Sequence, residues 1–447
     1  MRRLFAPAIL LVAACGSWQR VGSDTAAPPE EQAITQLVDM PGVFRSMGRL
    51  AAGPPLPFVG TVGLVAGPAD SAFAILAISL DAKDFTFTKA GNDFIAKYHV
   101  DMVAQRLGLP PIHLSQDEQI RVRTYAETQR ADESLLFQKI IRLPPGRYLF
   151  GVSLTDAGSS RRTQAAESLF VPSFAPGTLS SPFFTYQVKG RGARSEIPTA
   201  IVNPRGTAAF GGDTLLAYVE GYDITEARAV PFELRDERDS TVLRGNLHFT
   251  GGLPLEAHAI RIKSDSVPLG VLHLVVDPGP NQRVTGLLVS LSSAWLVTNY
   301  DEMITLLKYF GPTEQLTALK KASPEDRPAL WRKFWHDTDP NPETPENEAI
   351  ESYFSRLAVA NQAFKGEGMP GWRTDRGEVY ITLGPPDETY DSTPEGTSRV
   401  IRWIYLSYPL TVYFEDPNGF GRYLLTPSSR SDFDPVAARV RRSGPPS

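Results

Sequence analysis

The chain has 447 residues, with 45 lysines and arginines, 50 aspartates and glutamates and a single cysteine. Its net charge of −5, spread without long basic runs, argues against a nucleic-acid-binding protein, and 42% hydrophobic residues exclude wholesale disorder. The 36 glycines and 38 prolines favour a turn-rich β protein over a helical one. At roughly 150 residues per domain, the length predicts about three domains.

The first residues have the pattern of an export signal. Two arginines precede an apolar run, 4–14, that is too short to span a bilayer as a helix. The end of this run, followed by Cys15, resembles the lipobox of bacterial lipoproteins, which implies a signal peptide over 1–14 and a lipid on the cysteine. An ordinary cleavage site that happens to precede a cysteine is the alternative. Gly16 resembles outer-membrane sorting signals, so we expect a lipid-anchored envelope protein at the outer membrane.

Strand patterns dominate the part of the chain that follows a tether. Residues 15–56 are expected to form this tether, because 26–32 lacks an apolar face. From 57 to 175, apolar residues alternate with polar ones, as in 94–102. The Pro-Pro-Gly turn before Tyr148 resembles the late-strand corner of immunoglobulin-like and fibronectin-like sandwiches. We therefore predict a β-sandwich over 57–175.

A second set of short strands is predicted over 182–293. Gly and Pro clusters separate apolar runs such as 215–219, 230–235 and 271–276. No close internal repeat relates this segment to the first one, so only the architecture is expected to be shared. The sequence therefore predicts a second sandwich behind the first.

The hydrophobic period changes from two to about three and a half near Trp295, which predicts a helical block. Asn299 and Glu302 have the spacing of a capping box at the start of a helix. Thr344 followed by Pro345 has the order of cap and proline with which a further helix could begin. The last third of the chain is therefore expected to be a separate domain.

This domain is expected to be α+β and to cover 295–427. A strand over 379–383 and a hairpin over 400–415 are expected to form a small antiparallel sheet. The short basic end, 428–447, is assigned to a disordered tail. The predicted fold class is multidomain and mainly β: two immunoglobulin-like or fibronectin-like β-sandwiches, then a helical block and a small antiparallel sheet.

Several short motifs in the last domain carry a family resemblance. In chain order they are Phe334-Trp335, Asp339-Pro340, Asn347-Glu348, Arg356, Gly371-Trp372-Arg373-Thr374-Asp375-Arg376-Gly377 and Gly384-Pro385-Pro386-Asp387. Together they resemble the GWxTD domain, a family found at the C-termini of bacterial envelope proteins, often behind β domains. The resemblance implies a fold context and a compartment without an established reaction.

The motif allows a structural and a functional interpretation. In the structural one, Trp372 is a core residue, and Thr374 to Gly377 form a turn in which Asp375 closes an Asx-turn and the glycine takes a positive φ. In the functional one, Asp375, Arg376 and Asp387 converge, and the arginine presents its planar fork to a partner's carboxylate. Trp372, Thr374, Asp375, Arg376 and Asp387 are therefore the candidate binding residues.

Residue spacing gives one candidate calcium site in the last domain and no other cofactor site. Asp337, Asp339, Asn341 and Glu348 follow the ligand positions of an EF-hand loop, but Pro342 stands where that loop needs glycine. We favour a proline-stiffened loop, with these four residues as the calcium alternative. The six histidines lack paired metal-ligand spacing, and no nucleophile elbow or dinucleotide fingerprint occurs, so no cofactor is predicted.

Two function classes remain. The first is a non-catalytic envelope lipoprotein, held in the membrane through Cys15, whose domains bind or assemble with another envelope protein or a polymer. Its GWxTD-like domain is the candidate recognition surface. The alternative is a carboxylate-based, hydrolase-like enzyme in that domain, which requires Asp375 and Asp387 in one pocket. We favour the first class, with no catalytic residue assigned.

Overall fold

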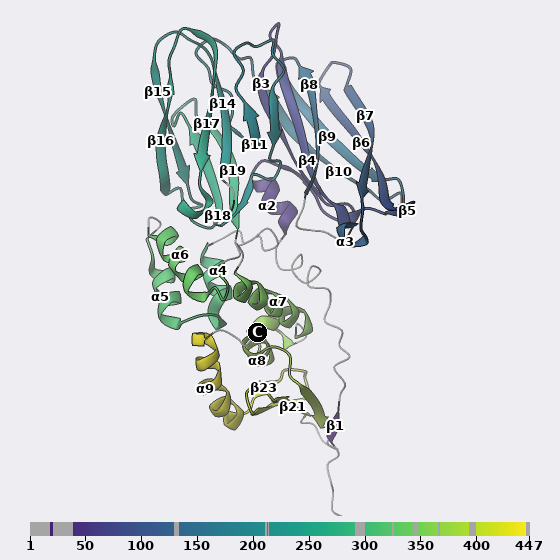
Figure 1. The fold of residues 1–447 in the computed structure, drawn as a ribbon, viewed down its shortest axis with the longest axis vertical. Helices are drawn as coiled ribbons and strands as arrows, with labels where there is room; N and C mark the ends of the chain where they lie inside the picture. Colours follow the sequence, from purple (N-terminus) through teal and green to yellow (C-terminus); the bar gives the residue numbers. More distant parts are fainter. Residues whose placement is uncertain are drawn as a thin grey trace, which may run out of the picture.

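The structure of the protein is a computed structural model that describes residues 18–20, 39–128, 134–210, 212, 214–290, 300–323, 326–342, 347–364, 367–392 and 399–443. Two β-sandwiches lie side by side at one end of the molecule, and a smaller domain of helices and one sheet lies at the other (Figure 1). The predicted fold class is confirmed. Among the described residues, no helix is long and apolar enough to cross a membrane.

The first sandwich packs two antiparallel sheets against each other. Its strands are β2 (Leu50–Ala52), β3 (Phe58–Ala66), β4 (Ala72–Asp81), β5 (Thr88–Ala90), β6 (Asp93–Arg106), β7 (Ile112–Val122), β8 (Ser134–Leu143), β9 (Gly146–Asp156) and β10 (Arg162–Val171), with short helices η1 (Ala82–Asp84) and α3 (Tyr125–Thr128). One sheet has the order β2-β3-β4-β8; the other has β10-β9-β6-β5, with β7 also paired to β6.

The period-two pattern of the sequence places the core of this sandwich. Along β6, Ala96, Tyr98 and Val100 are buried, while Lys97 between them is exposed. The predicted corner is also confirmed, because Tyr148 is buried and its hydroxyl donates to the carbonyl oxygen of Pro144 at 2.9 Å. The alternation of apolar and polar residues, together with the Tyr148 corner, determines which face of each strand points into the core.

The prediction of a tether over 15–56 was wrong for 18–20, which pair with a strand of the last domain, and for 39–56. Helix α2 (Met40–Ser46) begins after Asp39, whose side chain accepts a hydrogen bond from the backbone N–H of Gly42. Phe44 is buried on the sandwich, and the chain continues directly into β2. A capping residue followed by one buried aromatic is a weak pattern, which explains why the helix was missed. Cys15 lies outside the described residues, as do the rest of the predicted signal and residues 16–17 and 21–38 of the tether.

The second sandwich follows directly and confirms the predicted strands. These are β11 (Phe183–Lys189), β12 (Thr199–Val202), β13 (Thr207–Ala209), β14 (Leu215–Ile224), β15 (Arg228–Arg235), β16 (Thr241–Phe249), β17 (Leu253–Ile262), β18 (Gly270–Val276) and β19 (Arg283–Ser290), with η2 (Ser264–Ser266). The sheets have the orders β12-β11-β14-β17 and β13-β19-β18-β15-β16. Only β13 and β19 pair in parallel among the described strands.

A buried ion pair joins the two sandwiches. Arg191 Nε lies 2.7 Å from Glu220 Oε1, and both side chains are at most 3% exposed. The hydroxyls of Tyr218 and Tyr222 donate to the same carboxylate at 2.7 and 2.8 Å. Arg191 also donates to the carbonyl oxygen of Ala66 in the first sandwich. The carboxylate is thus saturated with donors, and its network crosses the domain boundary.

The last domain combines helices with a five-stranded sheet. Its helices are α4 (Tyr300–Leu306), η3 (Leu307–Tyr309), α5 (Thr313–Lys321), α6 (Arg327–Thr338), α7 (Glu348–Ala363), η5 (Gly371–Arg373), α8 (Asp375–Leu383) and α9 (Pro427–Ser443). The sheet has the order β1-β20-β21-β22-β23, built from β1 (Trp18–Arg20), β20 (Glu388–Ser392), β21 (Arg399–Tyr405), β22 (Leu410–Asp416) and β23 (Leu424–Leu425). Its first strand comes from the N-terminal end of the chain (Figure 1).

The helical block packs on the second sandwich through aromatic side chains. Phe210 of the sandwich lies 6.3 Å from the ring of Trp331 and 6.1 Å from that of Trp335, measured between ring centroids. Helix α7 begins at Glu348 with Asn347 as its cap, later than the predicted start at Thr344-Pro345, which lies outside the described residues together with Trp295 and Asn299. The predicted helical block is thus confirmed: α4 begins at Tyr300, as the capping box predicts, and only α7 begins later than predicted.

Two predictions for the end of the chain were wrong. The segment 379–383, predicted as a strand, lies in α8, whose buried residues fall on several sides and therefore give no helical period. The predicted disordered tail lies in α9 as far as Ser443, and Phe433, Ala437 and Val440 form its buried stripe. Pro435 and the basic residues around this stripe obscured it in the sequence.

Candidate functional site

The motif begins with a turn that starts helix α8. The Thr374 side chain caps the helix: its hydroxyl accepts from the backbone N–H of Gly377 at 3.0 Å and donates to the carbonyl oxygen of Gly371 at 2.8 Å. Trp372 is 7% exposed, as the structural interpretation predicted, and the Arg373 guanidinium lies 4.8 Å from its ring centroid. Thr374 therefore acts through the backbone of its own turn.

Gly377 is required for close approach. A Cβ on this residue would lie 2.1 Å from the carbonyl oxygen of Gly371, a distance that no side chain can occupy. The predicted positive φ at Gly377 was wrong, because the residue lies inside α8 with helical backbone. The glycine thus lets the turn 371–374 pack directly on the helix that it starts.

Asp375 ties α8 to the end of the chain. One carboxylate oxygen accepts from the backbone N–H of Leu425 in β23 at 2.7 Å, and the other lies 3.3 Å from the guanidinium of Arg430 in α9. Arg430 also pairs with Glu378, one turn further along α8, at 2.9 Å. The carboxylate of Asp375 therefore fastens three elements together rather than closing an Asx-turn.

Arg376 forms a buried pair with Glu367. The two charged groups are 2.6 Å apart, and their side chains are 17% and 2% exposed. The guanidinium also lies over the rings of Phe364 and Tyr423, at 4.8 and 4.4 Å from the centroids. Burial raises the pKa of Glu367, and the charge of Arg376 opposes this rise. The prediction that Arg376 presents its fork to a partner was wrong, because the fork is used inside the domain.

Asp387 lies past the other end of α8. Its carboxylate accepts from the backbone N–H of Leu406 at 2.6 Å, and its own N–H donates to the carbonyl oxygen of Ile404 at 2.9 Å. The nine residues of α8 rise about 13 Å between Asp375 and this region. The predicted convergence of Asp375, Arg376 and Asp387 was therefore wrong, and the two aspartates hold separate parts of the domain.

The calcium alternative finds no support in the described part of the loop. Asp337 lies 2.6 Å from Lys333 Nζ and accepts from Gln315, and these contacts lower its pKa. Asp339 accepts from the backbone N–H of Asn341 at 3.0 Å. Among the described residues, no group of three or more histidines, cysteines or acids is placed to hold a metal ion. The acids at the end of α6 act as local caps and ion-pair partners.

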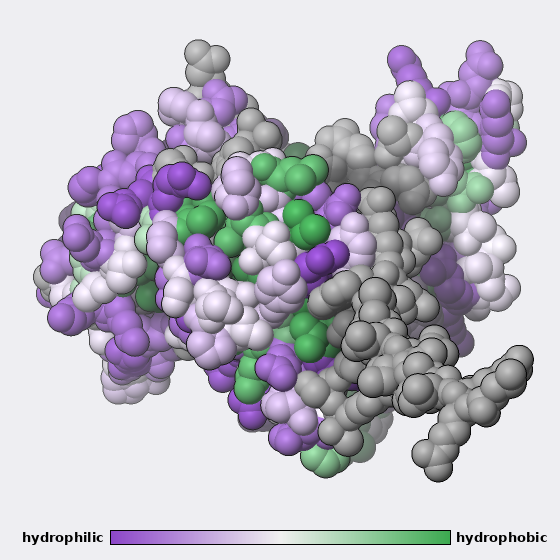
Figure 2. Space-filling model, turned by 90° about the horizontal axis from the view of Figure 1, so that it is seen from below, coloured by the Kyte–Doolittle hydropathy of each residue, from purple (hydrophilic) through white to green (hydrophobic). Residues whose placement is uncertain are grey.

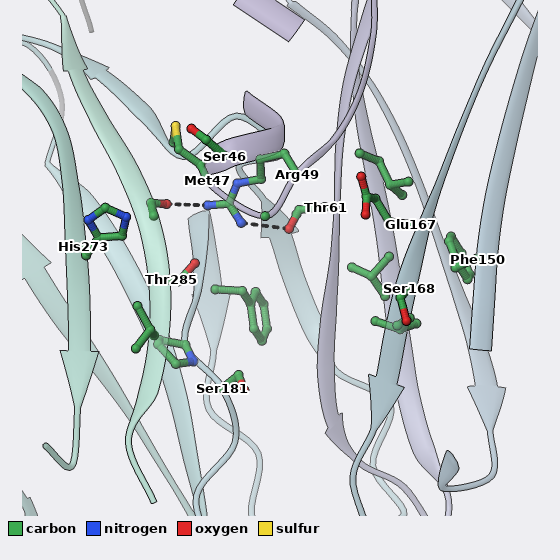
Figure 3. Close-up of a pocket in the computed structure, with 18 residues that line it drawn as sticks. Ser46, Met47, Arg49, Thr61, Phe150, Glu167, Ser168, Ser181, His273 and Thr285 are labelled. Atoms are coloured by element: carbon green, nitrogen blue, oxygen red, sulfur yellow. Dashed lines mark hydrogen bonds between the residues drawn. The ribbon is translucent and has the colours of Figure 1, made fainter. Parts of the chain in front are cut away.

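A pocket of about 340 Å³ lies where the two sandwiches meet (Figure 3). The end of α2 lines it together with residues of β3, β10, β18 and β19. In its wall, the Arg49 guanidinium donates to Thr61 Oγ1 at 3.1 Å and to the carbonyl oxygen of Gly286 at 2.7 Å, one in each sandwich. Burial lowers the pKa of Arg49 to about 10. We assign Arg49 to the joint between the sandwiches.

The partners that give the motif its role are not visible as a pattern in the sequence. Glu367, Tyr423 and Arg430 bind the motif residues, yet the last two lie about fifty positions away in the chain. No local pattern marks such a pair. One usable signal was the charge of α9, whose Arg430 and Arg441 both meet Glu378.

Comparison with known proteins supports the resemblance seen in the motifs. Residues 272–414 match the family model of the GWxTD domain, so the chain contains a GWxTD domain. The last domain, 300–443 together with β1, takes its name from this match, although β1 and 415–443 lie outside the matched residues. The match starts earlier than the predicted boundary at 295 and includes the last two strands of the second sandwich. No curated protein matches the chain.

Three solved structures have limited similarity to the chain. Trypsin-activated alpha-2-macroglobulin from Escherichia coli is 11% identical with a TM-score of 0.17, and the similarity covers 55% of this chain and 18% of that one. The native conformation of the E. coli protein is 11% identical with a TM-score of 0.18, and the similarity covers 53% of this chain and 16% of that one. A bacterial adhesin from Mobiluncus mulieris is 10% identical with a TM-score of 0.11, and the similarity covers 49% of this chain and 80% of that one. The chain thus spans less than a fifth of the length of the macroglobulin structures.

Proposed function

We propose that the protein is a membrane-anchored envelope lipoprotein that acts as a non-catalytic binding or assembly module. The observation that carries this proposal is the antiparallel pairing of β1 with β20, in the register Trp18 to Ser392 and Arg20 to Tyr390. Trp18 is three residues after Cys15, a stretch that spans at most about 10 Å. A lipid on Cys15 would therefore hold the molecule by its GWxTD domain.

This attachment leaves the two sandwiches at the far end. Strand β7 leads into α3, which lies at the end of the first sandwich nearest the GWxTD domain, so the turn 107–111 before β7 lies at the opposite end (Figure 1). In that turn Leu107 is 98% exposed and Leu109 is 50% exposed. Apolar side chains at an exposed turn favour a protein partner over a polysaccharide. We propose that the sandwiches present this end to another envelope protein.

The positions of Asp375 and Asp387 count against the enzyme alternative. It required Asp375 and Asp387 in one pocket, and these residues lie at the two ends of α8 with backbone N–H groups as partners. Trp372, Thr374 and Arg376 are used in internal packing and hydrogen bonds as well. We therefore assign the motif residues to the internal contacts of the domain and place the proposed binding role on other surfaces.

Metabolic labelling with an alkyne fatty acid tests the anchor. We expect the full chain expressed in a double-membrane bacterium to carry the label and to remain in the membrane fraction. The variant Cys15→Ser should lose both properties, while the neighbouring variant Ser17→Ala should keep them. A labelled Cys15→Ser chain, or an unlabelled wild type, would contradict the proposal.

Cross-linking in the intact envelope tests the binding role. A photo-reactive amino acid at Leu107 should give one discrete product with a second envelope protein. The same group at Lys263, an exposed position at the end of the second sandwich that faces the helices, serves as the control and should not give this product. Cross-links at Leu107 that are absent, or that are shared with Lys263, would refute a specific partner at this end.

A further inference from the structure

One loop of the GWxTD domain lies at the end of the sheet from which the chain leads back to Cys15. The register pairs Trp18 with Ser392, Ser392 with Val400, and Val400 with Glu415, so these four residues form one row across the sheet. The chain before Trp18 leaves from this row. Strand β22 ends one residue after Glu415, so the loop 417–423 extends beyond the same row.

This loop presents an aromatic side chain at its tip. Phe420 is 87% exposed, between Gly419 and Gly421, whose φ angles of 70° and 84° form the turn. The base of the loop is fixed, because Asp416 accepts from the backbone N–H of Gly421 at 2.7 Å. Phe420 is therefore held away from the domain by the backbone of its own loop.

The motif residues hold the other side of the loop. The backbone N–H of Tyr423 donates to Glu367 at 3.3 Å, and the Arg376 guanidinium lies on the Tyr423 ring. Two residues further on, the backbone N–H of Leu425 donates to the carboxylate of Asp375. The turn residues of the GWxTD motif thus fix the place at which the loop returns to the sheet, which links the motif to the surface that the loop forms.

The charges near this end suit an anionic surface. Arg422 in the loop and Arg399 at the start of β21 are exposed, and Glu415 is the exposed acid in the same row. Figure 2 views the molecule from the GWxTD end and shows hydrophobic residues among hydrophilic ones on this face. Phenylalanine side chains of peripheral proteins insert at the boundary between lipid head groups and acyl chains, and nearby arginines bind anionic head groups.

We propose that the loop 417–423 contacts the bilayer, with Phe420 inserted at the head-group level and Arg399 and Arg422 facing lipid phosphates. This inference rests on the proposed anchor, because Cys15 would bring this end of the sheet to the membrane. The expected surface is an anionic lipid bilayer. Two fixed points, the lipid and the loop, would then orient the GWxTD domain on the membrane and direct the sandwiches away from it.

The test uses the lipidated full-length protein, in which acylation blocks the single cysteine. A new thiol, Phe420→Cys, is labelled with bimane, and the protein is reconstituted in vesicles of phosphatidylethanolamine and phosphatidylglycerol that contain a nitroxide lipid. We expect the nitroxide to quench this label at least threefold more than a label at Leu406→Cys. Leu406 is 68% exposed in the turn at the opposite end of the same strands, which makes it the matched control.

A second comparison tests the charges. The change Arg422→Glu in the labelled Phe420→Cys protein should reduce quenching in vesicles with phosphatidylglycerol, and the reduction should disappear in phosphatidylcholine vesicles. Protein that floats with the vesicles while both labels are quenched equally overturns the loop contact and leaves the anchor intact. Protein that does not float overturns the anchor and, with it, the contact.

Discussion

Single residues of the GWxTD motif contact backbone groups of the domain. Thr374 and Asp375 accept from the N–H groups of Gly377 and Leu425, and Gly377 lets the carbonyl of Gly371 approach. Each of these contacts requires a specific side chain or its absence. These positions therefore tolerate few other residues, because the hydrogen bonds and the close backbone approach depend on the side chains present.

Gly377 is the most constrained of these residues. Alanine usually favours a helix by about 1 kcal/mol over glycine, but here its Cβ would collide with a backbone oxygen at 2.1 Å. We expect Gly377→Ala to destabilise the last domain by about 1–3 kcal/mol, the typical cost of overpacking. Thermal unfolding of the full chain measures this, with Gly192→Ala as control because nothing lies within 4 Å of that Cβ. Equal midpoints for the two variants would refute the steric argument.

His99 provides a pH-dependent contribution at the surface of the first sandwich. Its ring nitrogens lie 2.7 Å from Asp117 and 3.1 Å from Asp101, and these hydrogen bonds raise the pKa of His99. The folded state therefore holds the proton more tightly than the unfolded chain, whose pKa is 6.5. The stabilisation is complete below pH 6.5 and is lost as the pH rises through the folded pKa.

Proton NMR titration tests the cause of this shift. Asp117→Asn should lower the pKa of His99, because it removes the stronger hydrogen-bond partner. The exposed Asp239→Asn in the second sandwich is the control and should leave that pKa unchanged. A pKa that does not respond to Asp117→Asn would show that the carboxylate does not hold the proton on the ring.

Among the elements, most strands were predictable, whereas the helices α2, α8 and α9 were not. Strands such as β6 alternate between core and solvent, so the period of two is visible in the sequence. In contrast, α8 is buried on several sides, and the stripe of α9 is interrupted by Pro435. The candidate site shows the same limit, because its turn was visible while the partners that define its role came from β23 and α9.

Helix α9 is expected to stabilise the GWxTD domain through Phe433, which is fully buried. Truncation of a buried phenylalanine to alanine costs about 3–5 kcal/mol, so Phe433→Ala should lower the unfolding midpoint of this domain by several degrees. The neighbouring Asp432→Ala is exposed and should leave the midpoint nearly unchanged. Differential scanning calorimetry separates the two outcomes. Identical thermograms would restore the interpretation of 428–447 as a tail without a structural role.

On the scale of the whole molecule, the two sandwiches are joined by a shared apolar cluster and by the network of the buried pair Arg191–Glu220. Its hydrogen bonds reach Ala66 in the first sandwich and Tyr218 and Tyr222 in the second. The Arg49 guanidinium makes a second bridge at the pocket. The proposed presentation of the turn 107–111 to a partner requires such contacts between the sandwiches. A flexible boundary would leave the direction of this turn relative to the membrane undefined.

Glu220→Gln removes the negative charge that compensates Arg191, while the shape of the side chain at position 220 stays almost unchanged. Breaking a buried pair in this way costs about 3–5 kcal/mol, because the remaining charge stays out of water without a counter-ion. Since the network spans the boundary, we expect the variant to unfold in separate calorimetric transitions for the two sandwiches, where the wild type shows one. The exposed Glu226→Gln is the matched control and should keep the single transition. If Glu220→Gln unfolds as one unit with an unchanged midpoint, the ion pair is not what couples the sandwiches, and the bridge through Arg49 becomes the next one to break.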